Sequence, residues 1–249
     1  MPFTLSHPAA VLPLGGRGAG VLGALALPVL VAGSMAPDVP YYTPLPPSAR
    51  QWTHSWVGAF TVDVVLAVVL LAVGVLVAAP VAALFAPRTR ELLGDWTAHA
   101  WPRRWTAAAV LAWYVTLVVG TLSHVLWDAF THREGQVVQV VPALRTVVAG
   151  QAVYEWLQLA SSVAGGAVVL AFVVRAHRAE PDDGSGVPDR RRLTLVAAFV
   201  LAAALVGGVL KPSVAQWSWF NVLTGMGTGC ALALLVYAVL ARARVPARG

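Results

Sequence analysis

The sequence predicts an all-α fold, a polytopic membrane helix bundle of about six segments. Of its 249 residues, 58% are hydrophobic and only 11% are charged, whereas about a quarter of a soluble domain is charged. The hydrophobic residues are gathered in long runs. A helix is the structure expected for them, because the backbone groups of a segment in lipid must pair within that segment. We expect residues 1–249 to form a single integral membrane domain.

Five hydrophobic runs are long enough to span a bilayer, since about 20 residues of helix cross its hydrocarbon core. In chain order they are roughly Val57–Phe85, Trp105–Phe130, Val153–Val174, the shorter but uncharged Leu193–Leu210, and Trp217–Leu240. A sixth run, Val21–Met35, comes first and is shorter. It predicts either a tilted span or a re-entrant hairpin. In the hairpin, residues 5–14 enter the membrane, Gly15–Gly20 form the turn and residues 21–35 return.

The basic residues between these runs orient the chain. On one predicted side lie Arg88, Arg90, Arg103, Arg104, Arg175, Arg178, Arg190, Arg191, Arg192, Arg242, Arg244 and Arg248. The opposite side carries Arg50, Arg133, Arg145 and Lys211. Because cytoplasmic loops are rich in arginine and lysine, we expect the first side and the C-terminus to be cytoplasmic. The expected location is the inner membrane of a bacterial cell.

Other composition features exclude several classes of function. The net charge of +6 does not indicate a nucleic-acid partner, because no basic stripe with interleaved aromatic residues is present. The single cysteine, Cys230, excludes a disulfide framework and a cysteine-based zinc site. Residues 176–192 contain the stretch EPDDGSGVP, which is typical of a flexible linker, here on the cytoplasmic side. Membrane lipid is the expected partner.

Metal-type ligands gather on the other, outer side. His124, Asp128 and His132 follow one another at intervals of four residues near the end of one span, so they form a stripe on one helix face. Asp38 follows the first segment, and His54 precedes the second. Imidazole and carboxylate groups together suit zinc, manganese or iron. Ionisable groups are costly in membrane segments, which makes them functional candidates.

Non-catalytic alternatives remain open for these residues. Each one alone fits an interfacial histidine or a helix hydrogen bond, and a purely structural membrane protein would bind no metal. The set could also form a structural, sensing or transport site for a metal ion. The spans after residue 156 carry almost no ionisable groups within their apolar stretches, with Asn221 the strongly polar exception. That pattern favours a site at one membrane face over a transport pathway.

Further polar residues are candidates for supporting roles. Asp63 and Glu155 stand near the outer ends of their spans, where a carboxylate could orient a ligating imidazole or pair with Arg133 or Arg145. Ser55 follows His54 and lacks the surroundings of a serine nucleophile. We interpret it as a helix N-cap or as a group that supports the site.

The sequence resembles a bacterial membrane family, domain of unknown function 4184. The resemblance rests on the motifs MPFTLSHPAAVLPL, GSMAPDVPYY, THS and SHVLWDAFTH, which fall within residues 1–135, and it continues loosely through the later spans. The family name assigns no activity. The resemblance implies a membrane protein. The candidate ligands all fall within residues 1–135, which we expect to carry the metal site.

A more distant resemblance is to membrane-bound metal-dependent hydrolases. The matching positions are His7, Pro37 with Asp38, Arg50, Thr53, His54 and Ser55, and then His124, Asp128 and Thr131. This resemblance implies supporting roles for Arg50 and Thr131. Pro40 and Ala49 stand where that pattern has an aspartate and a histidine, so the resemblance does not imply a fully occupied multi-metal site.

The order of ligand types is also similar to that of the zinc-dependent phospholipase C and single-strand nuclease superfamily. That resemblance implicates His7, Asp38, His54, His124, Asp128 and His132. The later histidine and glutamate of that superfamily have no match on the outer side, because His177 and Glu180 lie in the predicted cytoplasmic loop. We therefore expect one or two divalent ions, with zinc the first choice.

The resulting functional hypothesis is a metal-dependent hydrolase at the outer membrane face. An ion held by histidine and aspartate can activate water and polarise a carbonyl or phosphoryl oxygen. Asp38 is the expected catalytic base, because it lies on a loop and is least committed by helix spacing. The membrane setting favours a lipid or another phosphoester as substrate.

Overall fold

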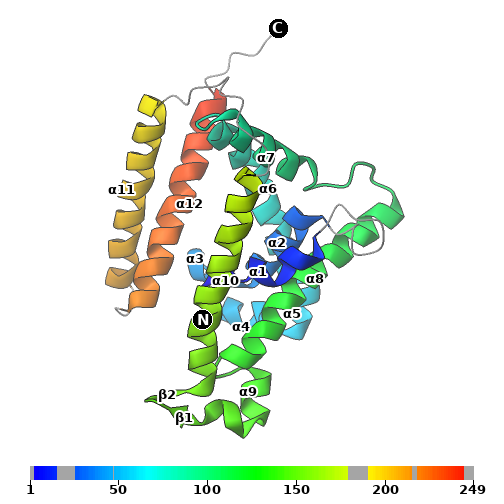
Figure 1. Ribbon diagram of the computed structural model, residues 1–249, viewed down its shortest axis with the longest axis vertical. Coiled ribbons are helices and arrows are strands. Elements are labelled where there is room, and N and C mark those ends of the chain that lie inside the picture. The colour runs from blue at the N-terminus through cyan, green and yellow to red at the C-terminus, as the bar shows by residue number, and fades with distance from the viewer. Residues whose placement is uncertain (1–2, 16–25, 47, 179–189, 215–217, 244–249) are drawn as a thin grey trace. The chain divides into compact units, whose positions relative to one another are not determined.

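The computed structural model describes residues 3–15, 26–46, 48–178, 190–214 and 218–243, and it confirms the predicted all-α fold. Five of the described helices are long and apolar enough to cross a membrane. They are α6 (Val62–Ala82), α8 (Ala107–Thr131), α10 (Val153–Arg178), α11 (Arg190–Val214) and α12 (Trp219–Ala243) (Figure 1). Each corresponds to one of the five predicted hydrophobic runs, so the chain is a multi-pass membrane protein.

Shorter elements connect these helices. Before α6 lie the 3-10 turn η1 (Thr4–Ser6), α1 (Pro8–Val11), η2 (Leu12–Leu14), α2 (Leu27–Met35), η4 (Ala36–Asp38), α3 (Val39–Tyr42), α4 (Ser48–Thr53) and α5 (Trp56–Phe60). Between α6 and α10 lie α7 (Pro87–Ala98), α9 (Gln136–Val140), η5 (Pro142–Arg145) and the antiparallel pair β1 (Val147–Val148) and β2 (Gln151–Ala152).

The sixth predicted segment, Val21–Met35, is described from residue 26 onward. There it forms α2, which has nine residues and continues into η4. The predicted turn at residues 16–20 and the linker residues 179–189 lie outside the described residues.

The chain divides into two compact units. The first comprises Met1–Pro40, Pro46–Leu71 and His99–Arg178, and the second comprises Tyr41–Leu45, Ala72–Ala98 and Ala179–Gly249. All six predicted metal ligands belong to the first unit.

Helices α2 and α8 form the centre of the first unit. Their backbones meet at two glycines, since a Cβ on Gly33 would lie 2.5 Å from the carbonyl oxygen of Leu117 and 3.0 Å from the Cα of Gly120. Small residues of this kind allow close helix packing in membranes. Leu30 and Leu117, beside these glycines, are fully buried.

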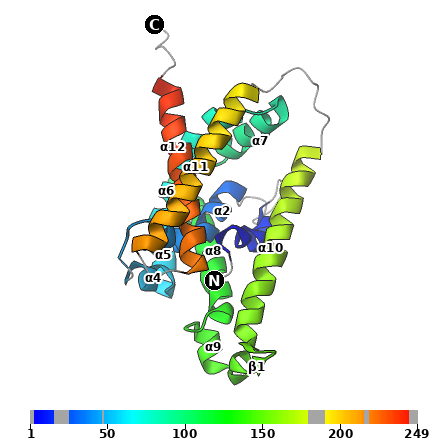
Figure 2. The same ribbon diagram turned by 90° about the vertical axis from the view of Figure 1, so that its left-hand side faces the viewer.

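Helices α11 and α12 run antiparallel, side by side, in the second unit (Figures 1 and 2). Gly207 of α11 faces Gly225 and Gly229 of α12, where a Cβ would collide with backbone. The Lys211 ammonium donates to the carbonyl oxygen of Tyr41 and, at 2.7 Å, to the Thr224 hydroxyl. The long helix pair is therefore tied to the short α3 segment within this unit.

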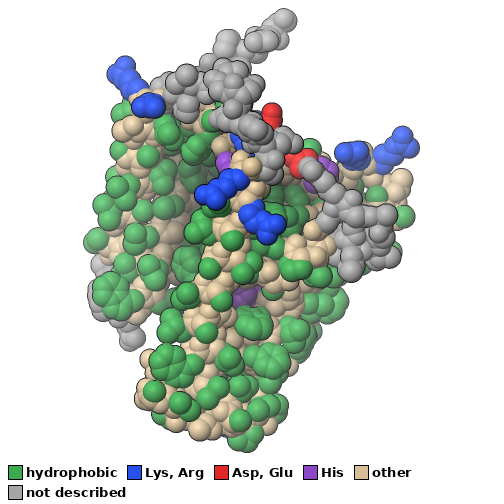
Figure 3. Space-filling model, viewed as in Figure 1, with side chains coloured by type: hydrophobic (Ala, Val, Ile, Leu, Met, Phe, Trp, Pro, Cys, Tyr) green, Lys and Arg blue, Asp and Glu red, His purple; other side chains and the backbone are tan. Residues whose placement is uncertain are grey.

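The surface of α10 agrees with a lipid environment. Leu159, Val163 and Leu170 expose 53%, 68% and 64% of their surface, and soluble monomers rarely expose contiguous apolar patches larger than a few hundred Å². Figure 3 shows hydrophobic side chains along most of this helix, with basic side chains near its C-terminal end.

Candidate metal centre

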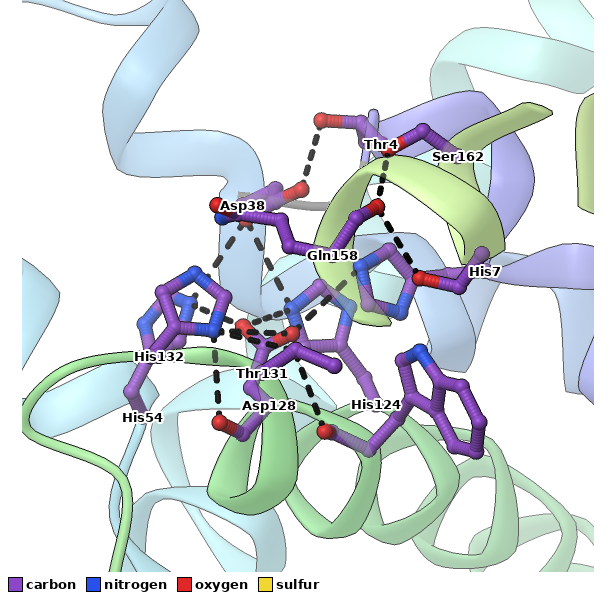
Figure 4. Close-up of polar contacts among 12 residues, drawn as sticks. Thr4, His7, Asp38, His54, His124, Asp128, Thr131, His132, Gln158 and Ser162 are labelled. Carbon is purple, nitrogen blue, oxygen red and sulfur yellow. Dashed lines mark hydrogen bonds and ion pairs between the residues drawn. The ribbon is translucent and has the colours of Figure 1, made fainter. Parts of the chain in front are cut away.

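Four side chains converge to form the core of the site. Asp38, His54, His124 and Asp128 each offer a ligand atom, and these four atoms all lie within 4.8 Å of one another (Figure 4). Residue 38 ends η4, residue 54 follows α4, and the other two occupy successive turns of α8. The helical stripe on α8 was predicted from the sequence, and the fold brings the two loop residues to it.

The distances show how the two carboxylates face the imidazoles. Asp38 Oδ1 lies 3.6 Å from His54 Nε2 and 3.5 Å from His124 Nε2. Asp128 Oδ2 lies 3.4 Å from His54 Nε2 and 3.3 Å from His124 Nε2. These separations exceed a strong charge-assisted hydrogen bond, so the four groups surround a common point rather than form two tight pairs.

Backbone carbonyl groups orient three of the imidazole rings. Nδ1 of His124 lies 2.7 Å from the carbonyl oxygen of Ser34, and Nδ1 of His54 lies 3.0 Å from that of Arg50. Nδ1 of His132 lies 3.3 Å from the carbonyl oxygen of Asp128. A proton on Nδ1 that is donated to a carbonyl leaves the lone pair on Nε2. This is the arrangement in which proteins hold metal-ligating histidines.

His7 joins the site from the N-terminal segment. Its Nε2 lies 3.7 Å from Asp128 Oδ1, and its ring stacks on His124 with centroids 3.7 Å apart. The Thr4 hydroxyl, one turn earlier, donates a 2.5 Å hydrogen bond to Asp38 Oδ2. His7 and Asp38 therefore lie on the same side, as the proposed return of the N-terminal segment requires.

His132 occupies the open edge of the site. Its Nδ1 lies 3.4 Å from Asp128 Oδ1, and its side chain is 22% exposed. The His54 side chain is 19% exposed, whereas Asp38 and His124 are fully buried. Water and a substrate can therefore approach from the side of His54 and His132.

The two oxygens of Asp128 face different partners. Oδ2 points to His54 and His124, whereas Oδ1 faces His7 and His132. In Figure 4 the Asp128 carboxylate lies between the rings of His54 and His132 on one side and those of His124 and His7 on the other. This position suits a ligand shared between two ions.

Several buried polar atoms of the site have no hydrogen-bond partner among the described residues. They are the Nε2 atoms of His7, His124 and His132, Oδ1 of Asp38 and both carboxylate oxygens of Asp128. A buried polar group without a partner costs about 1–3 kcal/mol. A divalent cation would satisfy these lone pairs together, so the donor set fits such an ion.

Three site residues lie outside the five membrane-spanning helices, and their protonation depends on neighbouring charges. Burial alone would lower the pKa of His54, but the carboxylates of Asp128 and Asp38 outweigh it and raise this pKa to about 10. Burial would raise the pKa of Asp38, but His124 and His54 hold it below its ordinary value. Burial, with the adjacent His124, lowers the pKa of His7 to about 3.

The residues predicted to support the site have varied surroundings. The Arg50 carbonyl accepts from His54, and the Ser55 side chain caps α5 by accepting from the Gly58 amide at 2.9 Å. The Thr131 hydroxyl lies 3.4 Å from Nδ1 of His132.

Among the described residues, neither predicted supporting carboxylate makes a hydrogen bond to an imidazole. Asp63 is fully buried, and neither of its oxygens has a hydrogen-bond partner in the part of the chain that the structure describes. Glu155 accepts a 2.8 Å hydrogen bond from the Ala152 amide at the start of α10. Orientation of an imidazole by either carboxylate stays a prediction.

Sequence reasoning missed Thr4 and Ser34. Thr4 stands three residues before His7, so a search of the same turn for hydroxyl groups could have found it. Ser34 acts through its backbone carbonyl, for which the sequence holds no signal.

The comparisons with known proteins give one match. The family described as Domain of unknown function (DUF4184) matches residues 1–239. No curated protein and no solved structure matches the chain.

Proposed function

The chain belongs to the family of domain of unknown function 4184, and we propose that it is a membrane-bound metal-dependent hydrolase. The observation that supports this proposal most is the convergence of Asp38, His54, His124 and Asp128 on one point. The ion would be held by these four residues. Zinc is the first choice, because imidazole nitrogen and carboxylate oxygen are among its usual ligands.

The number of donors favours a catalytic site over a structural clip. A structural zinc site is closed by four ligands, whereas six side chains gather here. Nε2 of His7 faces the second oxygen of Asp128, which offers a place for a second ion. The edge at His54 and His132 is open, as a site that receives a substrate requires.

An ion at this centre would lower the pKa of a water molecule and polarise a phosphoryl or carbonyl oxygen. The sequence favours Asp38 as the base that accepts the proton. Oδ1 of Asp38 faces His54 and His124, and Oδ2 accepts from Thr4, which supports a ligand role for Asp38 as well. His132 is the second candidate for the base, because its Nδ1 faces a carbonyl and its Nε2 keeps the lone pair.

The proposed substrate is a lipid or another phosphoester whose polar group reaches the membrane face. The centre lies towards the C-terminal end of α8, since His124 and Asp128 fall within its last eight residues and His132 follows it. A headgroup at the interface can meet such a site without entering the hydrocarbon. We propose that this face is the outer face of the inner membrane of a bacterial cell, on the side opposite the basic loops.

Elemental analysis of the detergent-purified protein tests the proposal. Wild type should retain one or two equivalents of zinc or manganese, and His124→Ala and Asp128→Ala should lose them. His99→Ala and His177→Ala are matched controls, since neither histidine belongs to the cluster. A protein that can never be loaded with metal would refute the proposal.

A second measurement separates hydrolysis from the structural alternative. The metal-loaded protein should cleave at least one member of a panel of phospholipids, prenyl phosphates and soluble phosphoesters. Metal retention without any cleavage, combined with unfolding on chelation, would instead identify a structural site.

A further inference from the structure

A second site candidate lies in the other compact unit, against the C-terminal half of α6. There a cavity of about 650 Å³ is lined by α6, α7 and α12. Its walls include Val75, Ala78, Ala79 and Leu93, and two arginines, Arg90 and Arg242, also line it. None of the residues that line it is acidic.

Pro80 explains why Arg242 lies at this cavity. Proline has no amide hydrogen, so the carbonyl of Leu76, four residues earlier, loses its partner within the helix. The Arg242 guanidinium replaces that partner, with Nε at 3.3 Å and Nη2 at 3.0 Å from the Leu76 oxygen. Two of its five N–H groups are used in this way, and the others have no partner among the described residues, so they can bind a ligand.

Arg90 is held in a similar manner from the other wall. Its Nε donates to the carbonyl oxygen of Phe85 at 3.1 Å. In the part of the chain that the structure describes, its terminal amino groups have no partner and can bind an anion. Each guanidinium is thus anchored at one edge by a backbone carbonyl. Two anchored guanidinium groups above an alanine-rich, apolar wall fit a molecule with an anionic head and a hydrocarbon tail.

We propose that this cavity binds one anionic phospholipid, with the phosphate between Arg90 and Arg242 and an acyl chain along the wall of α6. Arginine groups match phosphate oxygens in geometry as well as charge. Basic pockets between membrane helices bind anionic headgroups in the same way. The site does not involve the metal centre and does not depend on the proposed hydrolase activity.

Native mass spectrometry of the full chain in detergent tests the proposal, with phosphatidylglycerol and phosphatidylcholine of equal chain length as probes. Wild type should bind one phosphatidylglycerol and at least tenfold less phosphatidylcholine. Arg90→Gln should weaken phosphatidylglycerol binding about five-fold, the contribution of one basic residue near a membrane surface.

Arg88→Gln is the matched control. Arg88 lies on the same helix, α7, but it pairs with Glu91 at 3.4 Å and does not line the cavity. Its removal takes away the same charge and should leave binding within two-fold of wild type. Equal losses for the two variants would show non-specific attraction to basic helices and would overturn the proposal.

Two further arms complete the test. Arg242→Gln should weaken phosphatidylglycerol binding as well. That variant also removes the hydrogen bonds to the Leu76 carbonyl oxygen, so Arg90→Gln is the decisive variant. Glycerol phosphate should compete poorly, since it lacks the acyl chain. Displacement of the lipid by glycerol phosphate at similar concentration, or equal binding of phosphatidylcholine, would overturn the proposed occupant.

Discussion

Gly120 of α8 packs directly against Gly33 of α2, and a Cβ built on Gly120 would lie 2.9 Å from the Cα of Gly33. This close approach positions the metal centre. Ser34 follows Gly33, and His124 stands one helical turn after Gly120, so the imidazole Nδ1 reaches the Ser34 carbonyl at 2.7 Å. A glycine contact that binds nothing itself thus fixes the orientation of a candidate ligand.

We expect Gly120→Ala to destabilise the protein by about 1–3 kcal/mol, the usual cost of overpacking. The added Cβ would lie 2.5 Å from the carbonyl oxygen of Leu30, so α2 must move and His124 loses its support. Thermal unfolding in detergent and metal content measure the effect. Gly166→Ala is the control, because no atom lies within 4 Å of a Cβ there. It should be neutral or slightly stabilising, since alanine is the better helix former.

Gly165, next to that control position, carries a different prediction. A Cβ on Gly165 would lie 2.8 Å from the Cβ and carbonyl oxygen of Ser6, so Gly165→Ala should displace the segment that bears Thr4 and His7. Metal affinity should fall several-fold without vanishing, because His54, His124 and Asp128 stay in place. Titration with a zinc indicator measures this loss.

His7→Ala provides the comparison for Gly165→Ala. Both changes act on the same segment, so their effects should not add. The double variant should have the same metal affinity as whichever single variant binds metal less tightly. Full additivity of the two losses would show that Gly165 does not act through His7.

Metal binding should release about one proton from His54 near pH 7.5. Its raised pKa, about 10, keeps the metal-free imidazole protonated there, and a ligating imidazole must be neutral. Affinity should therefore rise with pH, by up to about tenfold per unit, and level off above pH 10. His7, with a pKa lowered to about 3, is already neutral and contributes no proton.

Calorimetry in buffers of different ionisation enthalpy measures that proton count. His54→Ala should bind more weakly and release about one proton fewer. Wild-type binding that releases none would contradict the protonated state inferred for His54.

Hydrophobic run length sufficed to predict the five long helices, because lipid leaves few other structures open to such runs. Helix periodicity likewise predicted the stripe of His124, Asp128 and His132. The side of the membrane on which His7 lies could not be predicted, since it depends on the path of the chain between residues 14 and 27. In the structure, η1 packs against α10, and this contact fixes the position of His7, which follows η1.

The sequence was least informative where a contact is made by a backbone carbonyl group and not by a side chain. Resemblance singled out Arg50, and the contact that reaches His54 is the Arg50 carbonyl. Every residue has such a carbonyl, so no residue type marks the position. The cavity at Arg90 and Arg242 escaped sequence reasoning for a related reason. Its arginines were counted only as topogenic charges, and the carbonyl freed by Pro80 becomes significant once α12 packs beside α6.

The orientation of the chain in the membrane is open to a direct test. Ala98 at the end of α7 and Gln151 in β2 are both exposed, and the single span α8 separates them. In a Cys230→Ala background, a membrane-impermeant maleimide should label Gln151→Cys in intact cells and Ala98→Cys only after permeabilisation. The arginines within α7 and in the loop after it predict this result, because basic segments between spans stay in the cytoplasm. The reverse labelling would place the metal centre, at the C-terminal end of α8, on the cytoplasmic face, and would require a cytoplasmic substrate.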